Sequence, residues 1–163
     1  MPVQTCTIPY VRAELKSRIA ALNLTYGDPT DPQAVGLSIG ETPGGFKREH
    51  IIIGEVPESH SDQTWAALGF RTRDETYTLD VVIRVEVPGV DCDDAQAEAY
   101  RLLAAIETDL RAAGAVNLGL AADRGVIAVE VSIPSDVLVM TDEGAACAVK
   151  FSLRVKARLG TTS

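Results

Sequence analysis

The chain has 163 residues, 46% of them hydrophobic, and a formal charge of −8 from 15 Lys and Arg against 23 Asp and Glu. This length predicts a single domain over residues 1–163 with a substantial core, and the acidity argues against a general nucleic-acid-binding face, which needs an excess of cations. We expect no signal peptide in the opening residues, and no membrane span because no apolar run reaches about 18 residues.

The first half of the chain predicts one helix followed by two strands. Over Ile8–Leu22 the apolar residues recur at helical spacing, and Pro9 suits a first turn. A loop with two Asp-Pro steps leads to short strands at Ala34–Ile39 and Glu49–Val56. We expect a polar loop over Pro57–Asp62 and a short strand or ordered loop over Trp65–Phe70.

The second half opens with a long strand and a second helix. Apolar and polar residues alternate through Asp74–Val87, which indicates a strand with two different faces. The helix begins at the capping pair Asp93 and Gln96, carries an apolar stripe, and is expected to stop at Gly114.

From Gly125 to Leu159 the sequence predicts one long β-hairpin. The first arm is expected to place Ile127, Val129, Val131 and Ile133 on one face, until Pro134 kinks the arm or marks a sheet edge. The second arm, Ala145–Leu159, alternates throughout and would be roughly 50 Å long. A compact domain of this size is only about 40 Å across. We therefore expect the arm to contact another molecule, most simply a second copy of the chain.

Together these elements predict an α+β fold: a single β-sheet with two helices on one face and a long C-terminal β-hairpin projecting from the domain.

The sequence contains no constellation that indicates catalysis or metal binding. Gly40–Lys47 resembles a phosphate loop, but Phe46 separates its glycine and lysine and the stretch lies between two strands. The histidines, His50 and His60, have no cysteine or second histidine at metal-ligand spacing. The acidic residues around Asp93 are explained by helix capping. Three widely separated cysteines are typical of a reduced cytosolic chain. We expect no enzyme activity, no metal and no cofactor.

Two features of the hairpin are candidate assembly surfaces. The cationic comb consists of Lys150, Arg154, Lys156 and Arg158, on one face of the second arm. It is interpreted either as a solvated face that limits aggregation or as an ionic seam to a neighbouring acidic subunit. The hairpin tip, Ser135–Gly144, carries the consecutive apolar residues Val137, Leu138, Val139 and Met140. Because both of its faces would be apolar, we expect a neighbouring molecule to cover it.

Three segments in this order give the chain a family resemblance: ETYTLDVVIRVEVPG, the helix DDAQAEAYRLLAAIETDLRA, and the terminal arm AVKFSLRVKARL. In the order of its elements and in the residue patterns within them, the chain resembles the tail terminator proteins of long-tailed bacteriophages. These are also called tail completion or minor tail proteins. The resemblance covers roughly residues 8–159 and includes no catalytic motif. The loop 57–73 matches no pattern of the family.

The resemblance implies a structural virion protein, assembled in the bacterial cytoplasm, that forms a homo-oligomeric ring, with six subunits expected. The ring would cap the tail tube protein, stop its polymerisation, and present a surface to the head-tail connector or neck protein. DNA would pass through its channel without specific binding. Three alternatives stay open: a neck or head-closure protein, a tail tube or baseplate subunit, and a small ligand-binding α+β domain.

Overall fold

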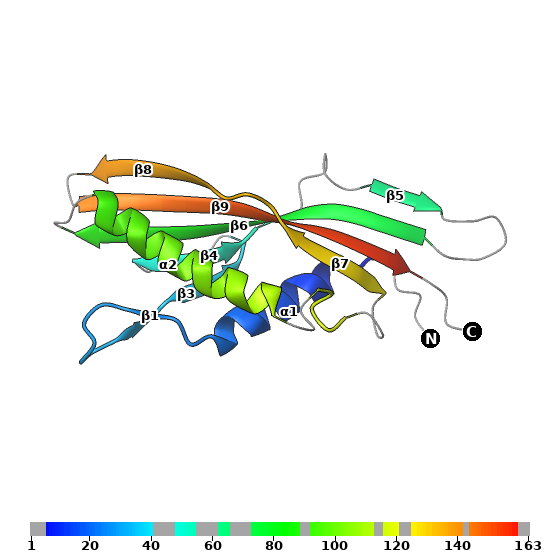
Figure 1. Ribbon diagram of the computed structural model, residues 1–163, viewed down its shortest axis with the longest axis horizontal. Coiled ribbons are helices and arrows are strands. Elements are labelled where there is room, and N and C mark those ends of the chain that lie inside the picture. The colour runs from blue at the N-terminus through cyan, green and yellow to red at the C-terminus, as the bar shows by residue number, and fades with distance from the viewer. Residues whose placement is uncertain are drawn as a thin grey trace.

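A computed structural model describes residues 6–40, 48–54, 62–65, 73–88, 92–112, 116–120, 125–141 and 144–159, with the backbone alone for 62–65 and 139–141. The described strands form one mixed seven-stranded sheet and a separate two-stranded ribbon. Both helices lie on the same face of the large sheet (Figure 1). No described helix has the length and apolar character that crossing a bilayer requires.

Two long strands form the centre of the sheet. β6 (Arg73–Pro88) and β9 (Gly144–Leu159) each have 16 residues and pair antiparallel over their whole length, from Arg73 opposite Leu159 to Pro88 opposite Gly144. Strict alternation keeps the apolar residues of both strands on the helix side. The long second arm of the hairpin therefore has an equally long partner within its own chain, and the domain is elongated.

Shorter strands flank this central pair on both sides. β4 (Glu49–Ile53) and β5 (Asp62–Trp65) pair with successive parts of β6, and β3 (Gly36–Ile39) lies parallel to β4. On the other side, β7 (Val126–Val131) and β8 (Ser135–Thr141) pair with successive parts of β9. The sheet thus has two different edges, one formed by β3 and β5 and the other by β7 and β8.

The two-stranded ribbon consists of β1 (Thr25–Tyr26) and β2 (Gln33–Ala34). It connects α1 (Ile8–Ala21) to β3 and overlaps the stretch for which the sequence predicted a loop and the start of a strand. The pairing continues just beyond the ribbon, because Val35 N–H donates to the Leu24 carbonyl at 3.0 Å.

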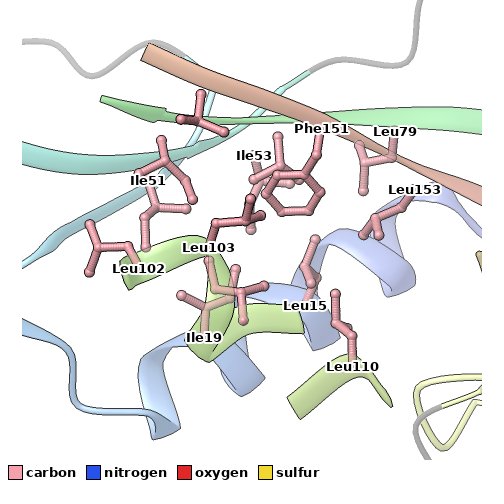
Figure 2. Packing of buried hydrophobic residues seen from close by; sticks show 14 of the residues in the cluster. Leu15, Ile19, Ile51, Ile53, Leu79, Leu102, Leu103, Leu110, Phe151 and Leu153 are labelled. Atoms are coloured by element: carbon pink, nitrogen blue, oxygen red, sulfur yellow. The ribbon is translucent and has the colours of Figure 1, made fainter. Parts of the chain in front are cut away.

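The core lies between the helices and the sheet. α1 (Ile8–Ala21) buries Val11, Leu15 and Ile19, and α2 (Cys92–Arg111) buries Ala95, Ala99, Leu102, Leu103, Ile106 and Leu110. Figure 2 shows Phe151 and Leu153 of β9 directed toward these helices beside Ile53 and Leu79. Burial of these side chains is the main force that holds the two layers together.

A buried polar cluster fixes the start of α1 against β6. Glu75 is 1% exposed, and its carboxylate accepts hydrogen bonds from the Thr7 backbone N–H at 2.9 Å and from Thr7 Oγ1 at 2.6 Å. Thr7 Oγ1 also lies 3.1 Å from Tyr77 Oη, and burial raises the pKa of that tyrosine. A negative group at a helix N-terminus is favourable, because the first N–H groups have no partners inside the helix.

The predicted α+β class, with both helices on one face of a single sheet and a long C-terminal hairpin, is confirmed. The end of the long strands where β5 and β7 lie extends past both helices, whereas the hairpin tip lies beside the start of α2 (Figure 1). The strand at Asp62–Trp65 was not predicted, because this short segment lies at the boundary of an expected polar loop. The stretches 41–47, 55–61 and 66–72, which include most of the expected strand or ordered loop at Trp65–Phe70, lie outside the described residues, as do Asp91 and Gly114.

The predicted face of the first hairpin arm is wrong at both of its ends. A β-bulge between Val126 and Ala128 shifts the register, so Val126 is buried and Ile127 is 53% exposed. Ile133 lies beyond the end of β7 and is 93% exposed. Only Val129 and Val131 pack against the core as expected.

Candidate assembly interface

The sheet face opposite the helices carries the cationic comb. All four of its residues stand at alternate positions of β9 that share this face with Asp74 and Asp80 of β6 and Glu130 of β7. Cross-strand neighbours on one face of a sheet are close enough to form ion pairs. The face is therefore a surface of alternating charge and not a purely cationic one.

Three cations of the comb pair with carboxylates of their own chain. Arg158 Nε lies 2.7 Å from Asp74 Oδ1, and its guanidinium lowers the pKa of that carboxyl. Lys150 Nζ lies 2.8 Å from Asp80 Oδ2. The other oxygen of that carboxylate, Oδ1, accepts a hydrogen bond from Ser152 Oγ at 2.6 Å. Exposed pairs of this kind contribute little to stability.

Arg154 differs from the other three. Glu130 stands directly opposite Arg154 in the register, yet its carboxylate pairs with Lys156, whose Nζ lies 3.0 Å away. The hydrogen bond from Lys156 is the main reason why the pKa of Glu130 is lowered, with a smaller contribution from Arg154. Among the residues that the structure describes, no ion pair to the exposed side chain of Arg154 is formed. It is thus the comb residue best placed to meet a carboxylate of another molecule.

The hairpin tip presents apolar side chains on both faces of β8. Val137 is 63% exposed on the open face of the sheet, opposite Ala148. Leu138 is 41% exposed on the helix face, opposite Cys147. The backbone of Val139 and Met140 continues β8, but their side chains lie outside the described part of the chain. The tip is also attached to its own domain, since Gln96 Nε2 of α2 donates to Asp136 Oδ2.

A crevice at the same end of the molecule contains a buried carboxyl that the sequence reasoning did not single out. It has a volume of about 590 Å³ and is lined by residues of α2, β4, β6 and the β1 end, including Glu49, Glu98 and Arg101. Glu49 is 4% exposed, and its Oε2 has no hydrogen-bond partner among the described residues. The sequence does indicate this burial, because the alternation of side chains along β4 places Glu49 on the same face as the buried Ile51 and Ile53.

Burial and the neighbouring charges shift the pKa of Glu49 upward. Burial first, and then the adjacent Glu98 carboxylate, raise the pKa of Glu49 to about 7, against a smaller opposing effect of Arg101. Arg101 lies 4.0 Å from Glu49 Oε2 but is held by Glu98, to which its Nε donates at 2.8 and 2.9 Å, and by the Thr25 carbonyl at 2.9 Å. The hydrogen bonds of Arg101 join the ribbon to α2. The arrangement holds no nucleophile.

In the described part of the chain, no group of three or more His, Cys, Asp or Glu side chains is arranged to hold a metal ion. His50 is buried, and its Nε2 lies 2.9 Å from Ser38 Oγ on the neighbouring strand. This contact links β3 to β4. His60 lies outside the described residues.

Comparison with known proteins gives a likeness of fold. No protein-family model matches the sequence, and no curated protein matches it. Among solved structures, a chain of the "Virion of native gene transfer agent (GTA) particle" superposes with a TM-score of 0.56 and 13% sequence identity. The match covers 94% of this chain and 100% of the other. At this identity, the match establishes that the two chains share a fold over almost their whole lengths.

Proposed function

We propose that this chain is a structural protein of a phage-like virion, and specifically a tail terminator that caps the tail tube and joins it to the head. The observation that carries the proposal is the whole-length likeness to a chain of a gene transfer agent virion. The resemblance of the sequence to tail terminators, noted above from different evidence, points in the same direction.

The two unlike edges of the sheet are suited to a ring. Ring closure needs a heterologous contact, in which one surface of a subunit binds a different surface of the next. Here β3 and β5 form one edge, and β7 and β8 form the other. The exposed Val137 and Leu138 would be covered in such a contact. We propose a ring of six subunits.

The charge distribution fits a channel for DNA. Three of the four comb cations are neutralised by carboxylates within the chain, and the protein as a whole carries −8. DNA would then slide past without the cation excess that phosphate binding requires. The role is that of a scaffold and not of an enzyme.

The test is assembly on tail tubes made from the tube protein of the same genome. Native mass spectrometry would measure the subunit number of the free protein, and electron microscopy would measure tube length and the presence of an end cap. We expect a ring at the tube end and tubes of limited length. A free protein that is monomeric is compatible with the proposal, because the ring can form on the tube. A chain that stays monomeric in the presence of assembled tubes would refute the proposal. Binding along the tube wall would favour a tube or baseplate subunit, and binding only to the head connector would favour a neck protein.

A further inference from the structure

The buried carboxyl of Glu49 has an oxygen that the rest of the described chain does not use. The side chain is 4% exposed and lines the crevice beside α2, yet its Oε2 has no hydrogen-bond partner among the described residues. Arg101 Nη2 lies 4.0 Å from this oxygen, which is too far for a hydrogen bond. A buried polar atom without a partner costs free energy, so a ligand that brings a donor to Oε2 would be stabilised there.

The two arginines that line the crevice are both engaged with other acceptors. Arg101 donates through Nε to both carboxylate oxygens of Glu98 and through Nη2 to the Thr25 carbonyl at 2.9 Å. Arg48 donates through Nε to the Glu86 carbonyl at 3.2 Å. The atom that lacks a partner in this crevice is therefore an acceptor, and the group that would complete the site is a donor.

The formal charges of the lining favour a donor that is also a cation. Three acidic and two basic side chains line the crevice, so its formal charge is −1 when Glu49 is ionised: Glu49, Asp94 and Glu98 against Arg48 and Arg101. One further positive charge would neutralise the site, whereas an anion would meet the buried carboxyl and its acidic neighbours.

The protonation of Glu49 is sensitive to such a charge. Burial first, and then the Glu98 carboxylate, raise the pKa of Glu49 to about 7. The β6 part of the lining is the apolar Val87, and the other charged or titratable groups come from α2, the start of β4 and β1, namely Asp94, Arg101, Arg48 and Tyr26. A cation beside the carboxyl favours its ionised form, so binding below pH 7 would release the proton of Glu49 to solvent.

The crevice also has space and apolar surface for a short alkyl chain. Its volume is about 590 Å³, and Val87 and Ala97 are part of the same lining. A primary ammonium group on such a chain carries three donors and one compact positive charge.

We propose that this crevice is a binding site for a primary alkylammonium group, which donates a hydrogen bond to Glu49 Oε2 and holds that carboxyl in its charged form. A lysine side chain of another protein and a free diamine share this chemistry. The site lies within one chain and needs no ring, so it goes beyond the proposed function and does not depend on it.

The first test uses n-butylammonium chloride as the probe and the purified full-length chain as the receptor. An NMR titration at pH 8 and constant ionic strength should give saturable shifts with a Kd in roughly the millimolar range, as expected for so small a ligand. Because only the ionised carboxyl is competent, the affinity should fall about tenfold for each pH unit below 7. n-Butanol, which has the same chain without the charge, should not bind.

The second test replaces the carboxyl. Glu49→Gln keeps its shape but cannot ionise, so the variant should fold, bind the probe at least about tenfold more weakly at pH 8, and lose the pH dependence. The matched control is Glu107→Gln, which removes a carboxylate that lies 3.2 Å from Arg111 Nη2 on α2 and lines no part of the crevice. It should bind like the parent. Equal binding by Glu49→Gln, equal binding of butanol, or an affinity that is level from pH 5 to 8 would overturn the proposal.

The source of the ammonium group is tested with two further probes, Nα-acetyl-lysine methylamide and 1,5-diaminopentane. Tighter binding of the lysine derivative would assign the site to a lysine side chain of a partner protein, and tighter binding of the diamine would assign it to a small molecule. A parent protein that binds none of the three amines at pH 8 would refute the site altogether.

Discussion

At the scale of single residues, Glu49 links stability to pH. Its carboxyl has a pKa of about 7 in the folded protein, raised mainly by burial, against 4.5 for an ordinary glutamate. Between these two values the folded state holds a proton that the unfolded state has released. Stability should therefore fall as pH rises from about 4.5 to 7, and become level above that range.

We expect Glu49→Gln to remove this pH dependence, because the amide keeps the shape of the protonated carboxyl and never ionises. The free energy of unfolding of the variant, measured relative to that of the parent, should increase by on the order of 3 kcal/mol as the pH is raised from 5 to 8. Urea unfolding at several pH values measures the gain. Glu14→Gln, on the outer part of α1, is the control and should show no comparable rise. A parent whose stability is level between pH 5 and 7 would show that Glu49 is ionised in the fold.

Arg154 provides a sharper test of the cationic comb than reversal of all four cations. Reversal of Lys150, Lys156 and Arg158 would place new carboxylates beside Asp80, Glu130 and Asp74, so the monomer itself would be disturbed. Arg154→Gln breaks no ion pair described in the chain and, unlike a reversal to Glu, places no new carboxylate opposite Glu130.

We expect Arg154→Gln to change the free energy of unfolding by no more than about 0.5 kcal/mol and to weaken ring assembly on tail tubes, most strongly at low salt. Thermal melting and tube-capping assays measure the two effects. Unchanged assembly at both low and high salt would assign the comb to a solvated face.

At the scale of elements, the start of the long hairpin depends on a glycine. Gly125 has a φ of +69°, and a Cβ at this position would lie 2.1 Å from the Arg158 carbonyl oxygen. Its own carbonyl accepts a hydrogen bond from Arg158 N–H at 2.8 Å. The chain therefore enters β7 along a path that only a residue without a side chain can follow.

We predict that Gly125→Ala destabilises the protein by at least about 2 kcal/mol, because it combines an unfavourable φ with a backbone clash. The matched control is Gly27→Ala, where φ is +89° but nothing lies within 4 Å of the added Cβ. The control should cost about 1 kcal/mol, for the backbone conformation alone. Equal losses in chemical denaturation would show that β7 moves to accommodate the methyl group.

At the scale of the whole molecule, the β6–β9 pair determines the shape. Because the pair is continuous over 16 residues, the domain is elongated, and the shorter strands can only extend the sheet sideways. This leaves different strands at the two edges, and different exposed side chains beside them. This asymmetry suits the heterologous contact that we propose, and the ring on tail tubes is the prediction that tests it.

The sequence by itself determined the elements that have strong periodicity. The alternation in β6 and β9 and the apolar stripe of α2 predicted those elements almost to their observed ends, because each pattern has many members and only one regular structure satisfies it. From these elements, the α+β class with both helices on one face of the sheet also followed. The exposed position of Val137 and Leu138 was predicted as well, since consecutive apolar residues cannot all point into one core.

Only the tertiary structure decided the features that depend on pairing between distant segments. The bulge beside Val126 turned Ile127 outward, and the end of β7 at Val131 left Ile133 outside, although the local sequence alternates regularly. β5 forms because β6 offers it an edge, and its four residues carry too little pattern to show this. The pairing of Glu130 with Lys156 rather than Arg154, and the burial of Glu49 under α2, depend on side chains more than 25 residues apart. Local periodicity carries no information about such contacts, because they are set by the register in which the strands and helices meet.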